Sequence, residues 1–233
     1  MVLSYVVSVL GSFTALQLAI AIPAARSIGQ RWSAITYAGA AMGGGAIWAM
    51  HFIAMIACQM ELQVSYDLGI TALSAVIGIV SCMVGLAIAS AGTFSWGKLF
   101  FAGLFMGLGV TGMHYTGMAA MLMPADIHYD QTLVAASAAI AIVASIVALW
   151  LAFNLRGKWQ MLGSALVMGV AVCGMHYTGM QAATFVPNDQ AVAHAGLNGA
   201  NLGMGIFAVT TVLLAVVLST SMLRQRQRAL VQI

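Results

Sequence analysis

Long apolar runs alternate with short polar stretches along almost the whole chain. A membrane-spanning helix needs roughly 20 mostly apolar residues. Seven runs of about this length occur, at 3–22, 35–58, 69–90, 99–122, 132–153, 161–183 and 204–223. The longest polar gap, 184–203, is too short for a soluble domain. The pattern predicts an all-α membrane protein with seven transmembrane helices over 1–223, and the start of a cytoplasmic linker or tail at 224–233.

The composition supports a membrane protein. Hydrophobic residues make up 62% of the chain and charged residues only 6%, whereas an ordinary soluble domain carries about 25% charged residues. The first apolar run precedes Arg26 and Arg31. A secretory signal carries its positive charge before the apolar stretch, so we expect this run to be retained as a helix. The net charge of +3 does not indicate a nucleic-acid partner.

Basic and acidic residues fall in alternate polar gaps. The basic residues occupy the odd gaps and the segment after the last run: Arg26, Arg31, Lys98, Arg156, Lys158, Arg224, Arg226 and Arg228. The acidic residues occupy the even gaps: Glu61, Asp67, Asp126, Asp130 and Asp189. Because basic loops tend to stay in the cytoplasm, this distribution predicts an N-terminus outside and a C-terminus in the cytoplasm.

A six-residue motif recurs late in the second, fourth and sixth runs. It reads MHFIAM at 50–55 and MHYTGM at 113–118 and 175–180. Its histidines, His51, His114 and His176, are 63 and 62 residues apart (114 − 51 and 176 − 114). The spacing predicts a helix pair used three times, with the seventh helix left over. Since the motif-bearing helices would all run in one direction, we expect parallel repeats about an axis near the membrane normal.

Helical spacing places each histidine on a face that also carries a glycine and a methionine, because residues three, four and seven apart share a face. The glycines before the histidines are Gly44, Gly107 and Gly169, and the methionines after them are Met55, Met118 and Met180. The methionines just before the histidines, Met50, Met113 and Met175, point about 100° away, where they could reach a neighbouring histidine or fill space. Each histidine lies roughly 10–12 Å below the outer end of its run, so we expect one shared level.

Three imidazoles and the thioethers beside them form a soft ligand set. Imidazole binds copper, zinc, iron or nickel, and thioether favours copper, above all Cu(I). Polar groups inside a membrane bundle usually mark function. We therefore predict a copper site, with haem iron on two of the histidines as a second possibility and interhelical hydrogen bonding as the structural alternative. The candidate ligands are His51, His114, His176, Met55, Met118, Met180, Met50, Met113 and Met175.

These motifs resemble those of the bacterial MHYT-domain family, and the resemblance covers essentially the whole chain. It implies an integral sensory domain of the bacterial cytoplasmic membrane, proposed to bind copper through Met and His and to sense oxygen, carbon monoxide or nitric oxide. In related proteins the domain often precedes cyclic-di-GMP synthase and phosphodiesterase domains. The first copy, with Phe52 and Ile53, departs from the family pattern, so Tyr and Thr are not required of every copy.

The function that the residues favour is a sensor that responds to a diatomic gas, to copper or to redox state, and that signals to a cytoplasmic output. A copper transporter or channel is an alternative, although the inner halves of the motif-bearing runs carry no histidine or acid. A copper enzyme is less well supported, because every carboxylate lies in a polar gap. We expect the chain itself not to be an enzyme.

Overall fold

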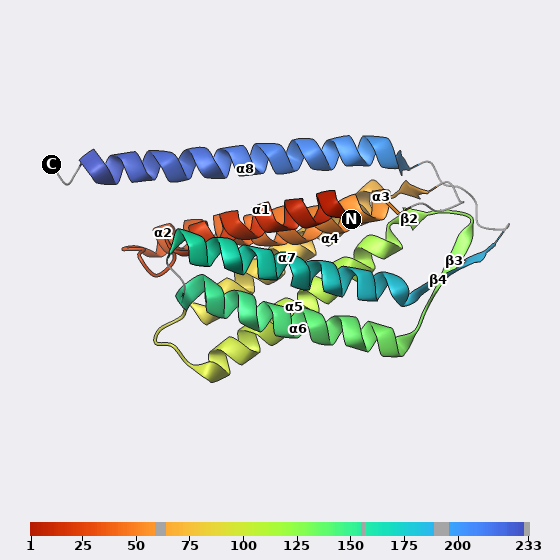
Figure 1. The fold of residues 1–233 in the computed structure, drawn as a ribbon, viewed down its shortest axis with the longest axis horizontal. Helices are drawn as coiled ribbons and strands as arrows, with labels where there is room; N and C mark the ends of the chain where they lie inside the picture. Colours follow the sequence, from red (N-terminus) through yellow and green to blue (C-terminus); the bar gives the residue numbers. More distant parts are fainter. Residues whose placement is uncertain (59–63, 155–156, 189–195, 231–233) are drawn as a thin grey trace.

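In a computed structural model the chain forms a bundle of long helices (Figure 1). The structure describes residues 1–58, 64–154, 157–188 and 196–230. Its helices are α1 (Val2–Ala19), α2 (Ile28–Gly39), the π-helical segment η1 (Ala40–Trp48), α3 (Ala49–Ile56), α4 (Leu68–Ala89), α5 (Trp96–Ala119), α6 (Gln131–Asn154), α7 (Lys158–Gln181) and α8 (Gly199–Leu230). Segments α2, η1 and α3 continue one another from Ile28 to Ile56.

The prediction of an all-α membrane protein is confirmed. Within the described residues, six helical segments are long and apolar enough to cross a membrane. The second begins at Ile28, earlier than the apolar run at 35–58 predicts, because the polar first turn of α2 is capped by the Ser27 side chain and helix formation starts there. The seventh predicted span falls on α8, where the part that qualifies as an apolar helix, Gly199–Val212, is shorter.

The first six spans form a closed ring. Each span packs on its neighbours in chain order, and α7 returns to pack on α1. Helix α8 lies along the outside of the ring, against α3 and η1 (Figure 1). Large apolar side chains such as Phe101 and Phe207 are exposed on the outer faces. The ring thus buries small residues inside and presents apolar bulk outward, as a bundle in lipid should.

Short strands gather at one end of the bundle, which we call the strand end (Figure 1). The strand β1 (Ser65–Tyr66) pairs antiparallel with both β2 (Met121–Leu122) and β5 (Leu197–Asn198), and β3 (Ala125–Tyr129) pairs with β4 (Ala183–Pro187). The sequence predicts only loops there, because strands of two to five residues are too short to show an alternating pattern.

The described charges are segregated between the two ends. At the strand end, Asp67 and Asp130 accept hydrogen bonds from the first backbone N–H groups of α4 and α6. At the opposite end, which we call the basic end, Arg31 donates to the Ala87 carbonyl and to Ser90, and Lys98 donates to the Ala91 and Thr93 carbonyls. The charges therefore cap helices at both ends and leave the middle of the bundle uncharged.

Three glycines bring each repeat against the next one, where a repeat is a helix pair that ends with a motif-bearing span (α1 with the span Ile28–Ile56, α4 with α5, and α6 with α7). A methyl group at Gly107 would collide with the backbone of α6 at Ile142, and one at Gly169 would collide with Tyr5 and Val9 of α1. In the first repeat Gly43, not Gly44, makes this contact, since a methyl group there would collide with α4 at Gly78 and Ile79.

The π-helical segment η1 explains this one-residue shift. A π-helix carries about one extra residue per turn relative to an α-helix, and η1, which contains Gly43, ends three residues before the first motif's histidine. The extra residue moves Gly43 into the place that Gly107 and Gly169 hold in the other repeats. The register inferred from spacing alone, which used Gly44, is therefore wrong for the first repeat.

A side chain at Gly107 should destabilise the ring. We expect Gly107→Val to lower the free energy of unfolding by about 1–3 kcal/mol, because overpacking at a helix contact forces the backbones apart. The matched control is Gly112→Val on the same helix, where an added methyl group meets only the Ile77 side chain at an ordinary distance of 3.9 Å. Thermal unfolding in detergent would measure both variants, and equal effects would contradict the packing role of Gly107.

Candidate metal centre

The three motif histidines meet inside the ring, near the strand end of α3, α5 and α7. The Nδ1 atoms of His51 and His176 are 3.0 Å apart, and those of His51 and His114 are 3.1 Å apart. All three side chains are buried, at 0–1% exposure. Their rings stand edge-on to one another, with centroids 4.8, 5.0 and 5.3 Å apart. The predicted convergence of three histidines at one level is therefore present.

Hydrogen bonds cannot satisfy this cluster by themselves. A neutral imidazole nitrogen carries either one hydrogen or one lone pair in the ring plane. The Nδ1 atom of His51 therefore makes a good hydrogen bond to only one of its two neighbours. Three buried imidazoles whose ring nitrogens lie within 4.8 Å of one another can instead serve as a ligand set for a metal ion. Nitrogens bound to one metal at about 2.0 Å would be roughly 3.5 Å apart, and the two Nδ1–Nδ1 distances of 3.0 and 3.1 Å are close to that value.

Two of the imidazoles press their other nitrogen against a glycine of the next repeat. A methyl group at Gly117 would overlap Nε2 of His51, and one at Gly179 would overlap Nε2 of His114. Among the described residues, neither Nε2 atom has a hydrogen-bond partner. At the equivalent position the first copy of the motif has Ala54 in place of glycine. The glycine of the motif thus makes room for the histidine of the preceding repeat, a role that sequence analysis did not assign.

A hydrogen bond from each repeat to the next fixes the orientation of the motif helices. Ser4, Ser74 and Ser137 are fully buried, and each donates its hydrogen to the carbonyl three residues earlier. Their oxygens are therefore left to accept. Tyr115 donates to Ser137 at 2.9 Å, and Tyr177 donates to Ser4 at 3.4 Å.

The first repeat makes the same connection with a different residue. Phe52 replaces the tyrosine and cannot donate a hydrogen bond. Trp48, one turn earlier, donates its Nε1–H to Ser74 at 3.0 Å instead. The role of the serines was not predicted from the sequence. A signal was present, because Ser74 and Ser137 are 63 residues apart (137 − 74), as are His51 and His114.

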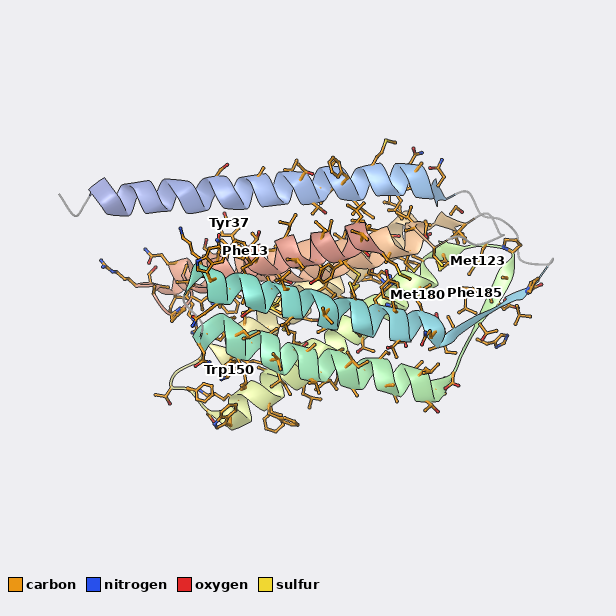
Figure 2. The ribbon with its side chains drawn as sticks, viewed as in Figure 1. Phe13, Tyr37, Met123, Trp150, Met180 and Phe185 are labelled. Atoms are coloured by element: carbon orange, nitrogen blue, oxygen red, sulfur yellow. The ribbon has the colours of Figure 1, made fainter. Side chains whose placement is uncertain are left out.

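The predicted methionine ligands divide into two groups. Met55 and Met118 are buried, and Met180 is half-buried, in a cluster that continues toward the strand end through Met121 and Met123. Figure 2 shows Met123, Met180 and Phe185 beside the strands. Of the preceding set, Met113 packs against Gly78 of α4. Met50, Met113 and Met175 are all nearly inaccessible. Ligation by any of these methionines stays a prediction.

The residues around the strand end are structural in character. Tyr66 is buried beneath the strands and stacks edge-on against Phe52. Burial, with a smaller contribution from Cys58, raises the pKa of Tyr66 to about 12. Burial likewise raises the pKa of Tyr129, which contacts Tyr115. Both phenols are therefore neutral at physiological pH. His128 lies exposed on β3, and His194 falls outside the described residues.

Comparison with known proteins identifies related sequences. The family named MHYT and described as "Bacterial signalling protein N terminal repeat" matches three times, at residues 44–102, 107–165 and 169–232. These matches begin at Gly44, Gly107 and Gly169 and contain the three motifs, so each match joins a motif-bearing span to the span that follows it. No solved structure matches the chain.

Several signalling proteins are similar to most of the chain. The bifunctional diguanylate cyclase/cyclic di-GMP phosphodiesterase MucR of Pseudomonas aeruginosa is 38% identical over 97% of the chain. The cyclic di-GMP phosphodiesterase NbdA of the same organism is 35% identical over 77%, and the signaling protein YkoW of Bacillus subtilis is 36% identical over 63%. The chain spans only 34%, 23% and 19% of the lengths of these relatives.

Removing the Tyr115 hydroxyl should loosen the contact between α5 and α6. We expect Tyr115→Phe to lower the free energy of unfolding by about 1 kcal/mol, because it leaves the buried Ser137 oxygen with one partner fewer. Tyr177→Phe is the matched comparison and should cost less, since its bond to Ser4 is longer. Unfolding in detergent would rank the two variants. A larger loss for Tyr177→Phe would contradict the hydrogen-bond argument.

Proposed function

Because the chain belongs to the MHYT family of bacterial signalling repeats, we propose that it is a membrane sensory domain that holds a copper ion between His51, His114 and His176. It is a multi-pass membrane protein related to cyclic-di-GMP signalling proteins. The enzymatic activities named for those relatives belong to proteins about three times as long or longer. By analogy, the partner of this domain is a cytoplasmic signalling output, often a cyclic-di-GMP enzyme in the family.

The observation that carries the copper proposal is the convergence of three buried imidazole nitrogens that cannot satisfy one another. The ligands are uncharged, and within the described spans no carboxylate approaches them. A monovalent soft ion adds the least charge to such an apolar site, which favours Cu(I) over a divalent ion. When bound, the ion supplies a coordination position at which a diatomic gas such as oxygen, carbon monoxide or nitric oxide can be sensed.

The protein's own residues hold this site in a defined state. The ring of small-residue contacts excludes water, and the Tyr–Ser and Trp–Ser bonds fix the rotation of α3, α5 and α7. Gly117 and Gly179 confine two of the imidazole rings. Gas binding, or a change of redox or copper state, would therefore alter the positions of all three helices.

Helix α8 gives the site a route to the cytoplasm. The His51 ring contacts Phe52 edge-on, with centroids 4.8 Å apart. Phe52 belongs to a buried cluster that includes Leu202 and Ile206 of α8. Since α8 continues to Leu230 at the basic end (Figure 1), a shift at His51 can be transmitted along it to an output domain.

Two alternatives are less well supported. A haem would need a slot for its porphyrin between two axial histidines, but the imidazole rings contact one another directly. A copper transporter or channel would need a continuous path, and the apolar side chains Ile47, Val110 and Val172 lie one turn below the histidines. Both arrangements favour a site that holds an ion in place.

We further propose seven spans, with three parallel helix pairs, the N-terminus outside and the C-terminus in the cytoplasm of a bacterial inner membrane. The segregation of basic and acidic residues between the two ends supports this orientation. The histidine centre would then lie in the outer half of the bilayer.

Metal analysis tests the proposed centre. Protein purified in detergent and reconstituted with Cu(I) should hold copper that a His51→Ala, His114→Ala, His176→Ala variant loses, as measured by mass spectrometry. The matched control is His128→Ala, which removes an exposed imidazole on β3 and should retain the copper. A parent without copper, or a triple variant that folds and retains all of it, would refute the proposal; haem in its place would move the assignment to iron.

Reporter fusions test the orientation. Alkaline phosphatase, which is active only outside the cytoplasm, should be active when fused after Asp130 and inactive when fused after Gly92. A fluorescent protein fused after Ile233 should fluoresce. The reverse pattern at the first two positions would contradict the proposed topology without bearing on the metal.

A further inference from the structure

A cavity lies inside the ring, on the basic-end side of the histidines. It has a volume of about 30 Å³ and an almost wholly apolar lining. Its wall toward the histidines includes Ile47, Val110 and Val172, each four residues before a motif histidine. The space is large enough for a small molecule or ion, and Met175, which directly precedes His176, also lines it.

Three methionines at equivalent positions of the repeats line this cavity. Met42, Met106 and Met168, which we call the methionine layer, each directly precede the glycine that contacts the next repeat. The equivalence of Met42 is hidden in the sequence, because the π-helical segment shifts the first repeat by one residue. The methionine layer lies eight or nine residues before the histidines, roughly 12 Å along the helices.

The cavity wall combines thioethers with a buried hydroxyl group. Met106 leans on Gly85 of α4, with its Sδ 3.0 Å from the position that a side-chain carbon there would take. Helices α1 and α6 contribute the small residues Ser12 and Ser145 to the cavity wall. The Ser12 hydroxyl is fully buried, and among the described residues it has no hydrogen-bond partner. A buried polar group without a partner is costly in an apolar cavity, and a bound molecule or ion beside Ser12 would reduce that cost.

We propose that the methionine layer is a second binding site for a soft monovalent ion, Cu(I), formed by the thioethers of Met42, Met106 and Met168. Neutral sulfur ligands in an apolar cavity select Cu(I) over hard or divalent ions. The Ser12 hydroxyl can then donate to a thioether or to a small molecule beside the ion. Its three methionines are distinct from the motif methionines and lie about two helical turns before the histidines on the same helices. The protein would thus hold soft ions at two depths on one axis.

Silver titration tests this site. Ag(I) is a redox-inert substitute for Cu(I), and native mass spectrometry in detergent counts the ions bound. We expect two Ag(I) ions on the parent and one on a Met42→Leu, Met106→Leu, Met168→Leu variant. Leucine conserves the methionine volume. The matched control replaces three methionines outside the cavity, Met83, Met161 and Met204, with leucine and should bind as the parent does. X-ray absorption at the silver edge should show fewer sulfur neighbours only in the first variant.

The outcomes separate the two sites. A single ion on the parent that the His51/His114/His176 variant loses would overturn the second site and leave the histidine centre standing. A single ion that the Met42/Met106/Met168 variant loses would support the second site and count against the histidine centre. Two ions on both the parent and that variant, with the same unfolding temperature, would also overturn the proposal.

Discussion

Close contact between helix backbones is the constraint on which the structure depends. In lipid, helices gain little from burying apolar side chains, so association relies on close packing and on a few interhelical hydrogen bonds. Here Gly43, Gly107 and Gly169 remove the side chain at the point where each repeat meets the next. The three motif helices are consequently drawn close enough for their imidazoles to touch. Larger residues at these positions would separate the histidines before any question of ligation arose.

The three repeats make equivalent contacts, but they make them with different residues. Tyr115 and Tyr177 connect to the next repeat through serines, whereas the first repeat uses Trp48 for the same bond. Gly117 and Gly179 accommodate histidine rings, whereas the first repeat carries Ala54 at the matching position. Within the part of the chain that the structure describes, only the first repeat contains a π-helical segment. The family motif is therefore best understood as a set of contacts between repeats, each of which several residues can make.

Much of this arrangement could be predicted from the sequence. The apolar runs place the helices because lipid demands about 20 apolar residues per span, and the regular spacing of His51, His114 and His176 predicts their shared level. The rest depends on information that spacing does not carry. A π-helical residue insertion is invisible in a periodic pattern, so Gly44 was assigned where Gly43 acts. The two-residue strands are too short to detect, and the part played by Gly117 is evident only once the histidine of the preceding repeat lies against it.

The departures of the first repeat coincide with the position of α8. That helix packs on α3 and η1, and its Leu202 and Ile206 share a buried cluster with Phe52. A tyrosine at this position would place a hydroxyl among apolar side chains, at a cost of a few kcal/mol unless it found a partner. Phenylalanine avoids that cost and keeps the ring contact to His51. The two regular repeats thus complete the histidine cluster, while the irregular repeat joins the cluster to the helix that leads toward the basic end. A sensor needs such asymmetry, because a fully symmetric centre would act equally on every helix around it and would direct its signal to none.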